Sequence, residues 1–232
     1  MILADAIQQA LSLLLGGNPV LWQIIGLSLQ VSLAATGFSL LLGLPCALVI
    51  ALYRFPGRRL LMLLVDTFMA LPPVVVGLMV YLLLSRAGPL GVLGLLYTPT
   101  AMIIAQTLLI TPIVIALALQ LFASQWQRLG DQLQMLGYRR HHCWRLLLHE
   151  TRLGLITVAL AAGGRALAEI GTVMIVGGNI EHHTRVMTTA IAMETRQGNL
   201  AMALALGLVL ILLALVITLI THRLKRPLEH RR

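Results

Sequence analysis

The chain has 232 residues, of which 59% are hydrophobic and only 11% are charged, and its mean hydropathy is +0.92. Its apolar residues come in runs longer than the core of a water-soluble domain requires, so the composition excludes a soluble globular protein and predicts an integral membrane protein. The formal net charge is +9, but the basic residues are distributed loop by loop rather than on one face, which excludes a nucleic-acid interface.

The first 18 residues are predicted to form a short amphipathic helix. Ile7, Leu11, Leu14 and Leu15 recur at helical spacing, and the run 16–19 (Gly-Gly-Asn-Pro) ends the pattern. The segment has no positively charged start, which argues against a cleaved signal peptide. We expect it to lie in the membrane interface on the outer side.

The rest of the chain is predicted to cross the membrane five times. Four runs contain no charged residue, and each covers the roughly 20 residues that a helix needs to cross the hydrocarbon core. A fifth run, 153–176, is equally long but contains two charged residues. The predicted spans are about 24–52, 60–85, 101–123, 153–176 and 200–221. The predicted fold is therefore an all-α polytopic membrane helix bundle, in one transmembrane domain covering 1–232.

The second span contains a proline pair and one acidic residue. Pro72 and Pro73 remove two backbone donors in mid-span, so the helix should be kinked there, either for packing or as a gate. Asp66 lies about one turn from the inner end of the span. We expect a local hydrogen bond or a pairing with Arg58 or Arg59, with a proton relay as the alternative.

A patterned connection follows the third span, over about 124–152. Leu129, Leu133 and Leu136 recur at i, i+4 and i+7, and Gly137 then interrupts the helical pattern. A short amphipathic helix of this kind fits a groove on a partner protein, or it rests on anionic lipid.

The histidines do not predict a metal site. His141 and His142 are adjacent, so on a helix they diverge by about 100°, and Cys143, His149 and Glu150 do not complete a converging set. His182 and His183 in the outer segment are also adjacent, so they do not predict a metal site either. The other cysteine, Cys46, falls in a predicted span, so we expect neither a disulfide nor a metal.

The fourth span holds Arg165 and Glu169. Four residues apart, they lie on one face of a helix and can neutralise each other. Charges at this depth normally face a bundle interior or a water-filled cavity. They are either a structural pair, or Arg165 presents positive potential to an anion while Glu169 holds it in place and keeps anion binding weak.

The outer segment 177–199 is too long for a simple turn. Thr184 can cap a short helix with an apolar stripe, formed by Val186, Met187, Ala190, Ile191 and Met193. From the pattern alone, this helix lies in the outer interface.

The distribution of basic residues predicts the orientation. If the N-terminus is outside, the inner segments hold thirteen Lys and Arg residues and the outer segments three, namely Arg86, Arg185 and Arg196. This bias predicts an N-out, C-in topology. The only lysine, Lys225, follows no glycine-rich loop, so the chain has no phosphate-binding loop and is not expected to hydrolyse ATP.

Four stretches resemble a known family. The loop around Gly137 resembles the consensus of permease subunits of ABC importers (Glu-Ala-Ala, three residues, Gly, nine residues, Ile, one residue, Leu-Pro). Asp131, Gln132 and Leu133 stand for the first triplet and Leu147 for the isoleucine, whereas His149 and Glu150 replace Leu-Pro. The stretches "GRALAEIGTVMIVGGNI", "TRVMTTAIAMETRQGN" and "LPPVVVGL" resemble the tungstate-uptake permeases, relatives of the molybdate and sulfate permeases.

The resemblance implies a type I ABC importer permease, which moves an oxyanion inward across a bacterial or archaeal plasma membrane. Tungstate is the first expectation; molybdate or sulfate import, or a stand-alone secondary transporter or channel, is the alternative. The implied partners are a second copy of the chain, two copies of an ABC ATPase that uses the ATP, and an extracytoplasmic binding protein; no cofactor is implied for this chain. The residues expected to couple to the ATPase are Leu129, Asp131, Leu133, Leu136, Gly137, Tyr138 and Arg139. The residues expected to line the pathway or its gate are Pro72, Pro73, Arg165, Glu169 and Arg185.

Overall fold

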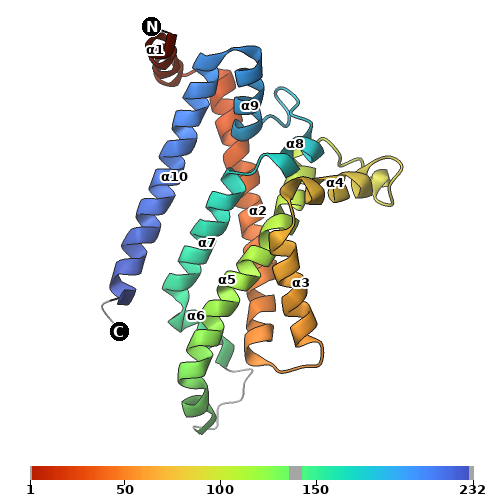
Figure 1. The fold of residues 1–232 in the computed structure, drawn as a ribbon, viewed down its shortest axis with the longest axis vertical. Helices are drawn as coiled ribbons and strands as arrows, with labels where there is room; N and C mark the ends of the chain where they lie inside the picture. The colour runs from red at the N-terminus through yellow and green to blue at the C-terminus, as the bar shows by residue number, and fades with distance from the viewer. Residues whose placement is uncertain (1, 136–142, 230–232) are drawn as a thin grey trace.

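The computed structural model is a bundle of long helices with the two termini at opposite ends (Figure 1). It describes residues 2–135 and 143–229, and these residues contain no β-strand. The elements are α1 (Ile2–Leu15), α2 (Pro19–Leu52), α3 (Arg58–Ala70), α4 (Pro73–Leu84), the 3-10 turn η1 (Gly91–Leu93), α5 (Pro99–Met135), α6 (Cys143–Glu150), α7 (Arg152–Leu167), α8 (Gly171–Gly177), α9 (Met187–Gln197) and α10 (Leu200–Glu229). The predicted all-α membrane bundle is confirmed.

Three helices are long and apolar enough to cross a membrane alone, within Pro19–Leu52, Pro99–Gly130 and Leu200–Arg223. Two bent pairs pass the same test when each is taken as one span, which gives up to five spans in the described residues. The axes of α3 and α4 differ by 101°, and those of α6 and α7 differ by 69°. The predicted kink at the proline pair is therefore close to a right angle, and α4 projects sideways from the bundle (Figure 1).

The centre of the bundle is the contact between α2 and α5. The side chain of Asn18 starts α2 by accepting hydrogen bonds from the backbone N–H groups of Val20 (3.0 Å) and Leu21 (3.2 Å). Small and hydroxyl residues then recur every three or four positions among the buried residues of α2: Ser28, Ser32, Ala35, Thr36, Ser39, Gly43 and Ala47. Residues of this size let two helix backbones approach closely inside a membrane.

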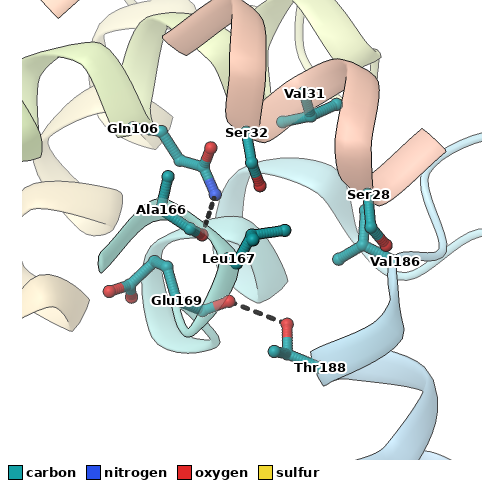
Figure 2. Close-up of a pocket in the computed structure, with 9 residues that line it drawn as sticks. All are labelled: Ser28, Val31, Ser32, Gln106, Ala166, Leu167, Glu169, Val186 and Thr188. Carbon is teal, nitrogen blue, oxygen red and sulfur yellow. Dashed lines mark hydrogen bonds between the residues drawn. The ribbon is translucent and has the colours of Figure 1, made fainter. Parts of the chain in front are cut away.

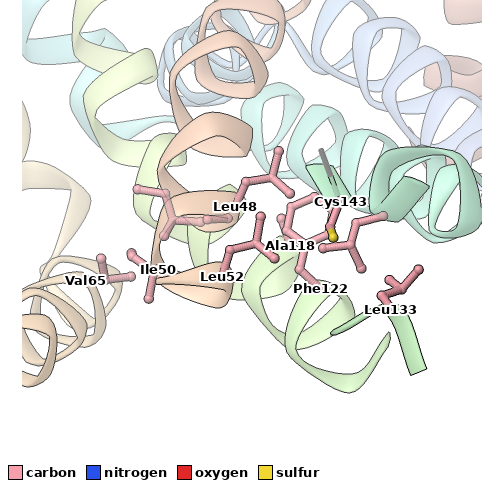
Figure 3. Packing of buried hydrophobic residues seen from close by; sticks show 11 residues of the cluster. Leu48, Ile50, Leu52, Val65, Ala118, Phe122, Leu133 and Cys143 are labelled. Atoms are coloured by element: carbon pink, nitrogen blue, oxygen red, sulfur yellow. The ribbon is translucent and has the colours of Figure 1, made fainter. Parts of the chain in front are cut away.

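Helix α5 packs against α2, α3, α4, α6, α7 and α8. The sequence predicted a span at 101–123 and a separate amphipathic helix after it, but the structure has one continuous helix from Pro99 to Met135. The distal part of α5 joins α2, α3 and α6 in a buried apolar cluster around Phe122 (Figure 3). We call this the Phe122 cluster: Ala47, Leu48, Ile50, Leu52, Val65, Ile115, Ala118, Phe122, Leu133, Cys143 and Leu147.

The predicted N-terminal helix is present as α1. Ala10 is fully buried, and it belongs to a cluster with Leu21 of α2, Met187 of α9 and Leu206 of α10. Helix α1 packs mainly on α10, at the end of the bundle where α9 also lies (Figure 1). It packs through Ala10, Leu13 and Leu14, whereas Ile7, Leu11 and Leu15 of the predicted apolar pattern are exposed.

Candidate functional site

The fourth apolar run, predicted as one span over 153–176, is interrupted. Helix α7 ends at Leu167 and α8 begins at Gly171. A Cβ atom on Gly171 would lie 2.8 Å from Cγ2 of Val74, so the start of α8 approaches α4 more closely than a side chain allows. An interrupted backbone within a membrane is stable only when protein groups or a water-lined cavity satisfy its free N–H and C=O groups.

Side chains from three segments satisfy the backbone at this break. The amide nitrogen of Gln106, on α5, donates to the carbonyl oxygen of Ala166 (3.2 Å). The hydroxyl of Thr188, on α9, donates to the carbonyl oxygen of Glu169 (2.7 Å). The carboxylate of Glu169 accepts a hydrogen bond from the N–H of Thr172 (3.1 Å), so it caps the N-terminal end of α8.

Glu169 also pairs with Arg165, as the spacing predicted. The guanidinium Nη1 lies 2.6 Å from Oε2 of Glu169, and the exposed fractions of the two side chains are 35% for Arg165 and 3% for Glu169. The carboxylate therefore uses both oxygens inside the protein, one for Arg165 and one for the α8 cap. Because the Arg165 side chain is about one-third exposed and the Glu169 side chain is buried, of the two charges the cation is the one that a ligand can reach.

A small polar cavity lies beside the break (Figure 2). Its volume is about 10 Å³, which is about enough for one water molecule. Ser28 and Ser32 of α2, Gln106 of α5 and Thr188 of α9 provide its polar wall (Figure 2). The rest of the lining is Val31, Ala166, Leu167, Glu169 and Val186. The Oε1 atom of Gln106 is buried with no hydrogen-bond partner among the described residues.

These polar residues were missed by sequence reasoning. Each is uncharged and lies in an apolar helix or in the outer segment. The available signal was that Gln106 is the first amide in the otherwise apolar run after Ala101, and that Ser28 and Ser32 are one helical turn apart. That signal identifies polar positions on separate helices, but it does not predict that their side chains line one cavity.

The proline pair lies next to the break. Helix α3 ends at Ala70 and α4 starts with Pro73 at its first position, where a proline needs no N–H partner. The hydroxyl of Thr172 donates to the carbonyl oxygen of Pro73 (2.8 Å), which joins α8 to the first turn of α4. The structure thus brings together Pro73, Arg165 and Glu169, three of the predicted pathway residues, around two interrupted spans.

Arg185 lies apart from this group. Its guanidinium is 3.5 Å from the carboxylate of Glu181, its side chain is 11% exposed, and it lines a different recess with Gln23 and His182. Thr184 does not cap α9, contrary to the prediction. Its hydroxyl accepts from the N–H of Ile180 and donates to the carbonyl of Gly177, so it closes the loop before the helix, which begins only at Met187.

The segment predicted to meet an ATPase is partly described. Asp131 lies in the final turns of α5, whereas Leu136, Gly137, Tyr138 and Arg139 lie outside the described residues. Leu133 is only 9% exposed and Leu129 packs beside it in the Phe122 cluster (Figure 3). The expectation that a partner groove buries these two leucines is therefore wrong for Leu133, because the chain's own core already covers it.

Asp66 is not paired with a neighbouring arginine. Arg58 instead donates from Nε to the carbonyl of Ile50 (2.9 Å), at the end of α2. Asp66 is exposed and, with Gln120 of α5, lines a recess of about 190 Å³ between α3 and α5. Its carboxylate has no hydrogen bond or ion pair within the described part of the chain, where no group of three or more metal-ligating side chains occurs either.

Comparison with known proteins gives consistent results. Residues 39–230 match the family model described as the binding-protein-dependent transport system inner membrane component. The chain is 43% identical over 182 residues to a probable anion ABC transporter permease protein of Haloferax volcanii, which covers 76% of this chain and 78% of that protein.

Two further relatives carry a named substrate. The chain is 39% identical over 204 residues to the tungstate uptake system permease protein TupB of Peptoclostridium acidaminophilum, which covers 87% of this chain and 88% of that protein. It is 28% identical over 174 residues to the sulfate transport system permease protein CysW of Escherichia coli K12, which covers 72% of this chain and 60% of that protein.

Proposed function

Because the chain belongs to the family of inner membrane components of binding-protein-dependent transport systems, we propose that it conducts a tetrahedral oxyanion into the cell, with tungstate as its preferred substrate. Membership of this family makes the chain the multi-pass permease subunit of an ATP-binding-cassette importer and not an enzyme. It also implies a separate ATPase and a separate substrate-binding protein as partners.

The substrate assignment rests on the similarity to a tungstate uptake permease, which extends over 87% of the chain. The sulfate permease is less similar and covers less of the chain. Molybdate is the second candidate, because it shares the charge and shape of tungstate and one relative is named only as an anion permease.

The geometry around Arg165 supports an anion pathway. An arginine side chain that is one-third exposed at a helix break can meet a dianion, and its planar guanidinium offers several donors to the oxygens of such an ion. The bound Glu169 carboxylate cancels part of its field, and a pathway needs such weak sites because the ion must leave. Pro72 and Pro73 form the adjacent break, where a change of backbone angle would open or close the route.

The substrate is tested most directly on the partner binding protein, because that protein selects what the permease receives. Calorimetric titration with tungstate, molybdate and sulfate is expected to give the tightest binding for tungstate. Tight binding of an amino acid or a sugar, with no heat from any oxyanion, would overturn the oxyanion assignment and leave the family assignment intact.

The permease is proposed to work as a homodimer with two ATPase copies. Within residues 2–135 and 143–229, one chain has a single charged break and no second copy of it. A two-fold axis is the commonest way to close identical subunits around a shared pathway. Helix α4 supports this arrangement. It projects sideways from the bundle, close to a right angle to α3 (Figure 1). Its apolar side chains Val74, Leu78, Met79 and Leu82 are exposed in a single chain, so a second copy could cover them.

The loop around Gly137 is proposed to receive the ATPase. Support comes from the described residues on either side of it in the chain, since Leu133 of α5 and Cys143 of α6 both belong to the Phe122 cluster, which connects α2, α3, α5 and α6. Replacing Leu136 by Asp is expected to leave membrane insertion intact and to abolish oxyanion uptake while ATP hydrolysis continues. The matching change at Leu133 is unsuitable as a test, because that side chain belongs to the protein's own core.

The proposed orientation has the N-terminus outside and the C-terminus inside. Helix α1 and the end of α10 lie at opposite ends of the bundle (Figure 1), and the thirteen-to-three distribution of basic residues favours a cytoplasmic C-terminal end. Alkaline phosphatase fused before α1 and a fluorescent protein fused after α10 should both be active, and the reverse pair inactive.

A further inference from the structure

Helices α4 and α8 belong to two different interrupted spans, yet they lie side by side in contact (Figure 1). One residue, Thr172, makes hydrogen bonds to both sides of this contact. We infer that Thr172 is a positioning residue that makes the two interrupted spans move together, so that opening the Pro72–Pro73 break displaces the Arg165–Glu169 pair. This inference rests on the proposed function, because it assigns a role within the same transport cycle.

The hydrogen bonds of Thr172 connect the two breaks directly. Its hydroxyl donates to the carbonyl oxygen of Pro73 at 2.8 Å, and its N–H donates to the carboxylate of Glu169 at 3.1 Å. The residue has no exposed surface, so water does not compete for either bond. A displacement of Pro73 therefore acts on Thr172, and through it on Glu169.

Two glycines keep α4 and α8 too close to slide independently. A Cβ atom on Gly77 of α4 would lie 2.9 Å from Cα of Thr172 and 3.3 Å from its carbonyl oxygen. On the other side, a Cβ atom on Gly171 of α8 would lie 2.8 Å from Cγ2 of Val74. At Gly77 the two backbones meet directly, and at Gly171 the backbone meets the short, β-branched side chain of Val74. Neither contact has a long flexible side chain that could relax, so the two helices are expected to move as a unit.

The connection continues beyond Glu169. Oε2 of that residue holds Arg165 on α7, and its backbone carbonyl accepts the hydroxyl of Thr188 on α9. Pro73, Thr172 and Glu169 are thus joined by hydrogen bonds that connect α4 to Arg165. Among the described residues, Arg165 is the only cation at the break. When the Pro72–Pro73 break opens, Arg165 is therefore displaced as well, and the anion bound to it is released.

The test uses the complete transporter in proteoliposomes, with its ATPase and binding protein, and measures tungstate imported per ATP hydrolysed. Thr172→Val keeps the shape of the side chain but cannot donate to Pro73, whereas Thr172→Ser keeps the hydroxyl. We expect Thr172→Val to lower the ratio about tenfold, the effect of one lost buried hydrogen bond, with ATP hydrolysis within about twofold of wild type. Thr172→Ser should restore the ratio to within about twofold of wild type.

A second pair of variants tests the backbone contact. Gly77→Ala adds a methyl group against Thr172 and should also lower the ratio. Gly207→Ala in α10 is the matched control, since a Cβ atom there meets nothing within 4 Å. This pair keeps the test decisive if the valine variant does not fold, and thermal unfolding of each purified complex shows which variants are folded.

The outcomes separate the two proposals. Failure of the wild-type complex to import any oxyanion would overturn the proposed function itself. Wild-type import with equal ratios for Thr172→Val and Thr172→Ser, or for Gly77→Ala and Gly207→Ala, would overturn the role of Thr172 while the proposed function stands.

Discussion

Glu169 binds three different groups within a few ångströms: Arg165, the N–H of Thr172 and the hydroxyl of Thr188. Its carboxylate is buried, so its charge depends on Arg165 for compensation. Its capping role depends only on having an oxygen acceptor. The two roles can be separated by substitution, because glutamine retains the acceptor and loses the charge.

We therefore expect Arg165→Ala to be more damaging to the fold than Arg165→Ala combined with Glu169→Gln. The single variant leaves a buried unpaired charge, which costs about 3–5 kcal/mol, whereas the double variant retains the cap and contains no charge. The measurement is the midpoint of thermal unfolding of the purified permease complex. Arg165→Lys is the control that preserves the cation. Equal midpoints for the single and the double variant would contradict the pairing.

Cys143 provides a second prediction at the level of one residue. It is buried in the Phe122 cluster, and burial raises the pKa of its thiol above the ordinary value. Only the thiolate reacts with maleimides, so a raised pKa lowers the reactive fraction at neutral pH. In a Cys46→Ser variant, N-ethylmaleimide should label the folded protein more slowly than the unfolded one, and the rate should rise about tenfold per pH unit up to the raised pKa. Equal rates in both forms would show that the thiol is accessible.

Single residues also show what could be predicted from the sequence. The contact between Arg165 and Glu169 follows from a separation of four positions, so it is local and was predicted. The contacts of Glu169 with Thr188, and of Thr172 with Pro73, join residues 19 and 99 positions apart. A single sequence contains no distance information at that range. The predicted pairing of Asp66 with Arg58 was wrong, because Arg58 donates its hydrogen bond to the backbone carbonyl of Ile50 instead.

At the level of helices, the crossing of α2 and α5 depends on one glycine. A Cβ atom on Gly43 would lie 2.7 Å from Cγ1 of Val114, whereas a Cβ atom on Gly37, two turns earlier in the same helix, meets nothing within 4 Å. We expect Gly43→Ala to destabilise the permease by about 1–3 kcal/mol through overpacking. Gly37→Ala should be neutral or slightly stabilising, because alanine is the better helix former.

Thermal unfolding of the two variants in the same detergent measures this difference. An equal effect of both substitutions would show that α2 and α5 do not approach as closely as described. Both glycines lie in one apolar run, so the comparison controls for insertion into the membrane.

Apolar runs predicted where helices would be, but not where they would be interrupted. The run 153–176 reads as one span, yet its helix stops after Leu167, since Gln106 and Thr188 supply hydrogen bonds that allow it to stop. The proline pair did signal its break, because proline acts locally. The continuation of α5 to Met135 was missed, since the change from an apolar to an amphipathic pattern resembles the start of a new helix.

At the scale of the whole molecule, the sideways position of α4 predicts where two copies meet. A cysteine placed at Leu82, on the exposed side of α4, should form a crosslink between copies in native membranes, in a Cys46→Ser, Cys143→Ser background. The control is a cysteine at Leu212, which is similarly exposed and belongs to α10, a helix on the opposite side of the bundle from α4 (Figure 1). Crosslinking at Leu212 with none at Leu82 would place the interface on α10 instead.

The unbroken course of α5 has a consequence for the timing of transport. At 1.5 Å per residue, its 37 residues form a rod of about 55 Å, which contacts α4 and α8 near one end and the Phe122 cluster near the other. The chain offers no loop along that rod at which movement could be delayed. Fluorophores attached near its two ends should therefore report a single shared relaxation rate after ATP is added. Two separable rates would show that α5 bends at Pro112, the interior position of the helix that lacks a backbone N–H donor.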